Sequence, residues 1–407
     1  MMVKMKDKTK IATSLHSYKQ MIGDSFEAIL SKGVSILIHS DVEHDQFGYD
    51  RYILFGIEDD DYWMDEVLSE PHILSITFMD CNEMPFDQEF WTKAAPFFEK
   101  LSTRNDAPHK IEYKLVSGLL VPALRVLPIT SLSFYQYIMQ DEDYEVMGNR
   151  LGDPSHLPLS LTTLKVNNDY NFQPGLDLSR LTRLKTLSIT YYGGTQLTKY
   201  AILPPSLTTL LIGRGVVEPL GKLPPSVTEL NLDTLTYDLS NDHQTLEKLD
   251  ISKHCLETNI LSKLVFSHLR SLTVFSVDSK LLEDIFTLSL FPALEEFKAV
   301  MTVGWRQSQP LDFTLSSSPL KKLTITNCHQ PILAPNCLQT LSVHFSKRNL
   351  PNQELWHNGV SPKGITELVL FIHGSNSDEY PKHYSYKLKQ TSCGLASSTW
   401  SISSHFV

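Results

Sequence analysis

Few residues of this chain have the types and spacing that chemistry requires. The segment Asp41–Asp45 (DVEHD) gathers carboxylate and imidazole groups ahead of Gly48, and such groups can bind metal ions. In a calcium-binding loop, however, the glycine and a distal glutamate occupy fixed places that this segment does not reproduce. His254-Cys255 and Cys328-His329 also lack the paired spacing of a zinc site. We therefore predict neither a metal ion nor a cofactor.

Motifs for catalysis are missing as well. Two glycine turns, Tyr191–Thr195 (YYGGT) and Gly213–Gly215 (GRG), lack the Gly-Lys-Ser/Thr or Gly-x-Gly-x-x-Gly spacing that cradles phosphate. No Gly-x-Ser-x-Gly turn occurs, and none of the five cysteines belongs to a Cys-x-x-Cys pair. We predict that the protein is not an enzyme. The alternative is an enzyme with its site in residues 1–120, which hold His44 and several acidic residues.

The charge distribution limits the class of partner. The net charge of the chain is −10, and all of the acidic excess lies in residues 1–150, with dense runs at Glu58–Asp61 and Asp141–Glu145. An acidic field repels phosphate backbones, so we expect no nucleic-acid ligand there. No apolar stretch is long enough to cross a membrane, and the few scattered cysteines suit a reducing compartment. These features predict a soluble cytoplasmic protein whose oligomeric state stays open.

The elements that must position any site come from an internal repeat. One six-residue pattern has apolar residues at positions 1, 4 and 6, and successive copies start 18 to 27 residues apart. This spacing is close to that of leucine-rich repeats. The copies are Leu161–Val166, Leu184–Ile189, Leu207–Ile212, Val227–Leu232, Leu246–Ile251, Leu269–Val274, Leu294–Ala299, Leu320–Ile325, Leu338–Val343 and Ile365–Leu370.

Each copy is too short for an amphipathic helix and has the period of a strand. Positions 4 and 6 share one face of a strand, and position 1 enters from the preceding turn. One such strand cannot bury its apolar face alone, whereas stacked copies share a continuous core. We therefore predict an α/β repeat protein rich in strands. Its fold is a leucine-rich-repeat solenoid with a curved parallel sheet and short extended or helical segments on the convex side.

Three copies carry a family resemblance. Leu157–Val166 (LPLSLTTLKV), Leu203–Ile212 (LPPSLTTLLI) and Leu223–Leu232 (LPPSVTELNL) resemble the FNIP repeat, a relative of leucine-rich repeats that is abundant in social amoebae. Its core reads roughly Leu-Pro-x-Ser-Leu-Thr-x-Leu-x-apolar, followed by a Phe-Asn-(Ile/Gln)-Pro turn. Tyr170–Gly175 (YNFQPG) looks like that turn with one residue displaced. The resemblance is close over about 157–235, decays toward a generic leucine-rich repeat by residue 370, and implies a repeat solenoid.

The flanking regions follow the pattern less closely. Residues 1–120 form either irregular N-terminal repeats, which we favour, or an α/β cap. Residues 121–372 form the solenoid, and residues 373–407 form a C-terminal cap with a flexible tail. We expect helices at Phe86–Leu101, with a bend at Pro96, and at Leu281–Phe286. We expect early strands at Val34–Ile38, Tyr52–Phe55, His72–Phe78, Ile111–Val116 and within Ile129–Phe134.

Positions 3, 5 and 7 of each copy point to the concave face, opposite the core. Thr and Ser dominate these positions, but the centre of the array differs because charged and aromatic residues gather there. We hypothesise that a protein partner binds at Glu229, Asn231, Asp233, Lys248, Asp250 and Phe275. The chain would then be a non-catalytic protein–protein interaction scaffold or adaptor. The alternative is a substrate-recognition adaptor of a ubiquitin ligase, for which we find no ligase-docking element.

Overall fold

The computed structural model describes most of the repeat strands and their entry turns. The residues that it describes are 34–39, 53–56, 64, 68, 73–79, 86–104, 110–115, 120–134, 153–167, 177–190, 202–213, 223–232, 239, 244–261, 264–287, 290–301, 311–314, 319–327, 332–346, 365–373, 383–394 and 397–406. The chain divides into two compact units. The first comprises residues 1–211 and 215–224, and the second comprises residues 212–214 and 225–407.

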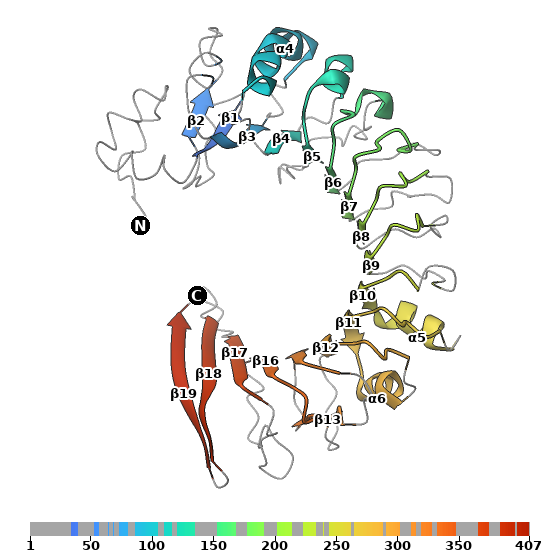
Figure 1. The fold of residues 1–407 in the computed structure, drawn as a ribbon, viewed down its shortest axis with the longest axis vertical. Coiled ribbons are helices and arrows are strands. Elements are labelled where there is room, and N and C mark those ends of the chain that lie inside the picture. The colour runs from blue at the N-terminus through green and yellow to red at the C-terminus, as the bar shows by residue number, and fades with distance from the viewer. Residues whose placement is uncertain are drawn as a thin grey trace, which may run out of the picture. The chain divides into compact units, whose positions relative to one another are not determined.

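The first unit is built on parallel strands (Figure 1). Strand β1 pairs with both β2 and β3, and from β3 the strands follow one another in chain order. The sheet therefore runs without a break across residue 120, where the sequence analysis placed a boundary. The strands that lie wholly or mostly in this unit are β1 (Val34–His39), β2 (Ile53–Gly56), β3 (Ile73–Met79), β4 (Lys110–Leu115), β5 (Ser131–Phe134), β6 (Thr163–Asn167), β7 (Thr186–Thr190) and β8 (Thr209–Ile212).

The second unit is built on the same kind of parallel strand pairing. Seven strands pair in parallel, and two antiparallel strands, β18 and β19, follow β17. A short parallel pair, β13 (Leu311–Asp312) with β15 (Ile332–Leu333), lies outside this sheet. The main strands are β9 (Glu229–Leu232), β10 (Lys248–Ser252), β11 (Ser271–Val277), β12 (Glu296–Met301), β14 (Lys322–Thr326), β16 (Thr340–Ser346), β17 (Glu367–His373), β18 (His383–Gly394) and β19 (Ser397–Phe406).

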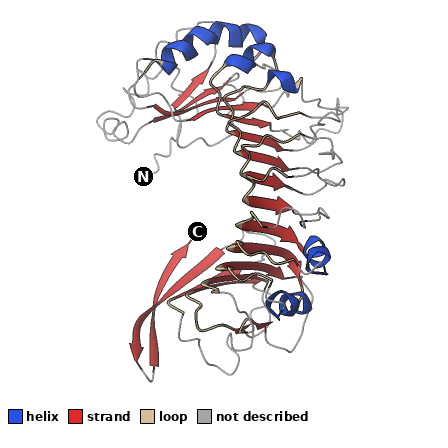
Figure 2. Ribbon diagram, turned by 45° about the vertical axis from the view of Figure 1, so that its right-hand side comes forward, coloured by secondary structure: helices blue, strands red, loops and turns tan. Residues whose placement is uncertain are grey.

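Few helices accompany the strands, and in each unit they lie on the same side of the sheet as the connecting segments (Figure 2). The first unit has α4 (Gln88–Ser102) and two short 3₁₀ turns, η1 (Pro122–Val126) and η2 (Pro154–His156). The second has α5 (Lys253–Leu261) and α6 (Ser279–Thr287). The fold is a β-rich repeat solenoid, as the periodicity predicts.

Every predicted copy of the repeat supplies a strand that begins at its third residue. Leu161–Val166 leads into β6 at Thr163, and the other nine copies show the same offset. Positions 1, 4 and 6 form the core: Leu161, Leu164 and Val166 are at most 1% exposed. The equivalent residues of the other copies that the structure describes are also buried. We call the opposite face of each sheet the front face.

Helix α4 closes the core of the first unit around an aromatic cluster. Asp87 caps the helix, because its Oδ1 accepts a hydrogen bond from the Phe90 backbone N–H at 2.8 Å. Trp91 is fully buried, with its ring centroid 5.2 Å from that of Phe78 on β3 and 4.8 Å from that of Tyr113 on β4. The Trp91 indole N–H donates to the Phe86 carbonyl at 3.1 Å, so burial leaves this donor satisfied.

The structure confirms both predicted helices and differs from the sequence analysis at other elements. The first helix continues through Pro96 to Ser102. Helix α5 was not predicted, because its sequence, KHCLETNIL, has almost no amphipathic periodicity. Where the sequence analysis expected one capping strand and a flexible tail, the structure has the antiparallel strands β18 and β19, which extend to Phe406.

Candidate functional site

Five of the six predicted partner-binding residues lie on three neighbouring strands of the second unit. Glu229 and Asn231 belong to β9, Lys248 and Asp250 to β10, and Phe275 to β11. The sixth, Asp233, lies outside the described residues. The alternation of buried and partly exposed residues along β9 and β10 puts the four charged or amide side chains on the front face.

The strand register aligns these residues in rows. Lys248 is the register partner of Glu229, and Asp250 is the register partner of Asn231. Neighbouring strands of a sheet lie about 4.8 Å apart, so the residues of a row are close enough to contact one ligand together. Phe275 is in a third row, beside Ser252 of β10. The structure therefore brings these five residues together as one patch, which we call the β9–β11 patch.

Asp250 carries an incompletely satisfied carboxylate. Its Oδ2 accepts a hydrogen bond from Asn231 Nδ2 at 3.4 Å, which is a long and weak contact. Its Oδ1 is buried and has no hydrogen-bond partner in the described part of the chain. A carboxylate has several acceptor sites, and a buried acceptor without a donor is unfavourable. This oxygen can accept a hydrogen bond from a donor supplied by another molecule.

Other charges on the same face pair with one another. Glu296 on β12 forms an ion pair with Lys322 on β14 at 3.7 Å. Glu229 and Lys248 occupy the same row, yet neither forms an ion pair with a described residue. Glu229 and Lys248 therefore differ from the Glu296–Lys322 pair, because no described residue competes with solvent or a partner protein for their charges.

Phe275 lies on the front face by the regular alternation of β11, and an irregularity of the strand follows it directly. The register between β11 and β12 shifts between Phe275 and Val277, and Ser276 between them has a φ of 61°. This extra residue is a β-bulge. As a result Val277 returns to the core, where it is fully buried, while Phe275 stays partly exposed beside Val300 of β12.

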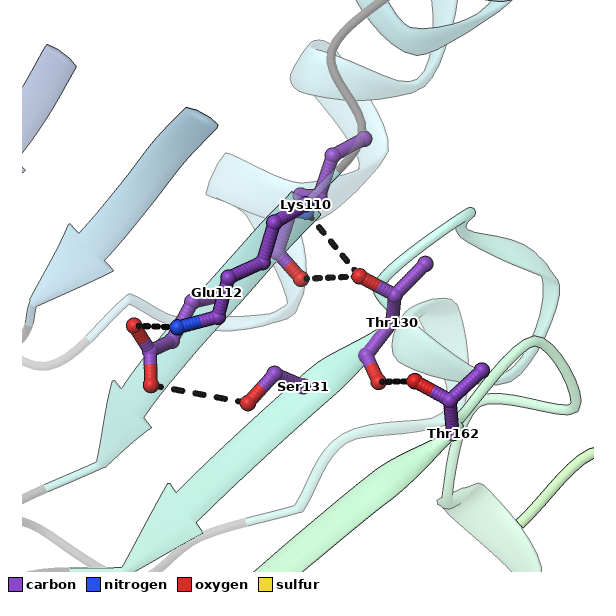
Figure 3. Close-up of polar contacts among 6 residues, drawn as sticks. Lys110, Glu112, Thr130, Ser131 and Thr162 are labelled. Carbon is purple, nitrogen blue, oxygen red and sulfur yellow. Dashed lines mark hydrogen bonds and ion pairs between the residues drawn. The ribbon is translucent and has the colours of Figure 1, made fainter. Parts of the chain in front are cut away.

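A second polar group on a front face was not predicted. Glu112 on β4 is only 7% exposed and forms an ion pair with Lys110 Nζ at 2.8 Å (Figure 3). Ser131 on β5 donates a hydrogen bond to the other Glu112 oxygen at 3.5 Å. Ser133, two residues further along β5, is fully buried, and its Oγ has no partner among the described residues. In Ile129–Phe134 the two serines alternate with Leu132 and Phe134, and this alternation could have placed both serines on the front face.

Threonine hydroxyls outside the strands bind the neighbouring repeat. The Thr130 hydroxyl bonds with the backbone carbonyl of Ile111 at 3.2 Å, and the Thr162 hydroxyl donates to the backbone carbonyl of Thr130 at 3.0 Å (Figure 3). Thr208 and Thr366 make the same bond to Lys185 and Gln339. These threonines hold successive repeats in register, so we assign them a structural role.

The described residues include no group of three or more His, Cys, Asp or Glu side chains placed to hold a metal ion. The segment Asp41–Asp45 lies outside them. Among the described helices, none has the length and apolar character needed to span a bilayer. Comparison of the chain with models of known protein families, with curated proteins and with solved structures finds no match.

Proposed function

We propose that this protein is a non-catalytic interaction scaffold or adaptor whose β9–β11 patch binds a protein partner. The observation that carries the proposal is the Asp250 carboxylate on the front face, one oxygen of which is buried and has no partner among the described residues. Lys248 lies two residues away on the same strand and forms no ion pair with a described residue, and Phe275 adds partly exposed aromatic surface on β11. Desolvated charges beside an aromatic anchor are typical of the residues that dominate protein interfaces.

The chemistry of the patch indicates which partner group would bind it. Asp250 can accept hydrogen bonds and carries a negative charge, so it suits a Lys or Arg side chain of the partner. Lys248 lies beside Glu229, so the row that these two residues form suits a neutral or mixed-charge surface of the partner. Phe275 and Val300 are register partners and offer apolar contact at the third row. We therefore expect a partner segment with one basic residue flanked by apolar side chains.

We also infer that the repeats are leucine-rich repeats of the FNIP type. Support comes from the hydroxyl groups of the Leu-Pro-x-Ser-Leu-Thr core. Ser160 donates to the carbonyl of Ile129 at 2.8 Å, and Ser206 donates to the carbonyl of Leu184 at 2.8 Å. The Ser hydroxyl of the motif thus donates a hydrogen bond to the backbone of the preceding repeat, and this bond explains why the motif has a serine at that position. The few scattered cysteines, with Cys337 as a free thiol, support a location in the cytoplasm.

The test is a binding comparison between two variants that change equal charge. In the first, Glu229, Lys248, Asp250 and Phe275 are replaced by Ala. In the control, equivalent positions on β12, β14 and β17 are replaced by Ala: Glu296, Lys322, Glu367 and Val369. Affinity purification with chemical cross-linking is run on the full chain and on both variants. Circular dichroism and thermal unfolding show whether each variant is folded.

The proposal requires that the first variant loses partners that the wild type and the control variant retain. A single Asp250→Lys change should then abolish the same interaction, because it places an ammonium group against the basic group of the partner. If all cross-linked partners persist in the folded first variant, the β9–β11 patch is not the binding surface.

A further inference from the structure

The front face of the first unit contains a row in which a buried hydroxyl lies between two lysines. Ser133 on β5 is the register partner of Lys114 on β4 and of Lys165 on β6. Ser188 on β7 comes next in the same row. With strands about 4.8 Å apart, the two lysines start about 10 Å from one another, which lets their long side chains converge above Ser133.

Three donors in this row have no acceptor among the described residues. Ser133 is 0% exposed, and its Oγ has no hydrogen-bond partner among the described residues. Neither Lys114 nor Lys165 takes part in a hydrogen bond or ion pair with the described residues. Buried polar groups are nearly always paired. An acceptor for the Ser133 hydroxyl would therefore lie beside Lys114 and Lys165, the register partners of Ser133.

The charge around the row favours an anion. The one acidic residue on β4 is Glu112, two residues before Lys114, and it forms an ion pair with Lys110 at 2.8 Å. The equivalent row of the second unit shows the contrast, because there Thr273 lies between Asp250 and Lys298. One acidic and one basic neighbour compensate each other, whereas two lysines leave a net positive charge.

We propose that Lys114, Ser133 and Lys165 form a binding site for a phosphate-type oxyanion. Such a group carries close to two negative charges and several acceptor oxygens, which match two ammonium groups and one hydroxyl. A carboxylate has one charge and would leave one ammonium group uncompensated. The oxyanion is either free phosphate or the phosphate of a phosphorylated side chain, since both present the same oxygens. This site is separate from the β9–β11 patch.

The experiment is a ³¹P NMR titration of the full chain at low salt. One arm uses inorganic phosphate, and the other uses the peptide acetyl-Gly-Gly-phosphoserine-Gly-Gly-amide. Saturable broadening of a phosphorus resonance in either arm supports the site, and the arm that saturates at lower concentration identifies the source. The absence of saturable broadening in both arms overturns the proposal.

Variants locate the binding. The double change Lys114→Ala and Lys165→Ala should weaken binding by about tenfold or more, because two charge-assisted contacts are lost. Lys298→Ala is the matched control, since Lys298 is exposed and occupies the same row position in the second unit. Its affinity should equal that of the wild type.

Ser133→Ala gives an independent test if the double variant fails to fold. This change removes only the hydroxyl, and it should weaken the binding while leaving thermal unfolding at the wild-type temperature or above. Wild-type affinity in both the double variant and the serine variant, or an equal loss in Lys298→Ala, would show that the phosphate binds elsewhere.

Discussion

Asn231 and Asp250, register partners on β9 and β10, are joined by one hydrogen bond from the Asn231 amide to Oδ2 of Asp250, at 3.4 Å. The second carboxylate oxygen is buried and has no partner among the described residues. Other described positions of the front faces hold hydroxyl side chains, such as Thr163 and Thr186, or the paired charges of Glu296 and Lys322. A buried polar atom without a partner lowers stability, and such atoms are expected on a binding surface, where another molecule provides the missing hydrogen bond.

The Asp250→Asn change should leave the protein as stable as the wild type, or raise its free energy of unfolding by about 1 kcal/mol. The substitution keeps the shape of the side chain and removes a charged acceptor that lacks a donor. Asn231→Ala should have the opposite effect, because it deprives Asp250 of its only described donor. Urea unfolding followed by circular dichroism measures both. A clear loss of stability in Asp250→Asn would show that the carboxylate is satisfied in solution.

The stability of the second unit should depend on pH through Asp278. Burial acts to raise the pKa of Asp278, but hydrogen bonds from Lys253 and from the Leu281 backbone N–H, with the nearby positive charge, hold that pKa below its ordinary value. A carboxyl group whose pKa is lowered by folding stabilises the protein above its unfolded pKa, about 3.9 for Asp, and loses that contribution as the pH falls. Asp278 is also the residue that caps α6.

Two substitutions separate the cap from the ion pair. Asp278→Ala removes both and should cost about 1–2 kcal/mol at pH 7. Asp278→Asn retains a capping oxygen but loses the ion pair with Lys253, so it should cost less. The difference between wild type and Asp278→Asn should shrink below about pH 4, where the wild-type carboxylate takes up a proton. Thermal unfolding from pH 3 to pH 8 measures this, and a difference that does not change with pH would contradict the assignment.

The periodicity of the sequence predicted the strands and their buried positions because each repeat faces the same physical problem. The residue at position 4 of each copy, such as Leu249, has similar neighbours in every repeat of the stack, so the same apolar residue type recurs along the chain. The same logic predicted that Lys248 and Asp250 share the front face. It did not predict which charges remain unpaired, because that depends on side-chain contacts between strands whose separation in the sequence varies.

Irregular elements escaped the sequence analysis for a different reason. Helix α5 is held by its position after β10, where Cys255 and Leu256 are buried, and not by a helical apolar stripe. The bulge at Ser276 leaves no mark in the sequence because serine is not a residue that usually signals positive φ. The buried serines of β5 looked like ordinary strand residues of an exposed face. Contacts with residues distant in the sequence determine the helix α5, the bulge at Ser276 and the burial of the β5 serines.

The serine of the Leu-Pro-x-Ser core should contribute to stability through its hydroxyl. Ser160 Oγ donates to the carbonyls of Leu127 and Ile129, at 2.9 and 2.8 Å, and these carbonyls belong to the preceding repeat. Ser160→Ala should therefore lower the free energy of unfolding by about 1 kcal/mol. Ser267→Ala is the control, since Ser267 is exposed and makes no described bond. Equal unfolding midpoints for the two variants would refute the structural role of this serine.

The bulge in β11 should be sensitive to branching at Ser276, whose φ is 61°. A β-branched side chain is poorly tolerated at positive φ, so Ser276→Val should be about 1–3 kcal/mol less stable than Ser276→Gly. Ser271→Val, in the regular part of the same strand, should cause no such loss, because β-branched residues favour strands. If the strand relieved the strain by becoming regular, Val277 would turn from the core to the front face, whereas Phe275 would keep its place through its pairing with Ser252 of β10. The loss of stability therefore comes from the strained backbone and from the exposure of Val277, and urea unfolding of the three variants measures it. Equal stability of Ser276→Val and Ser276→Gly would contradict a positive φ at this residue.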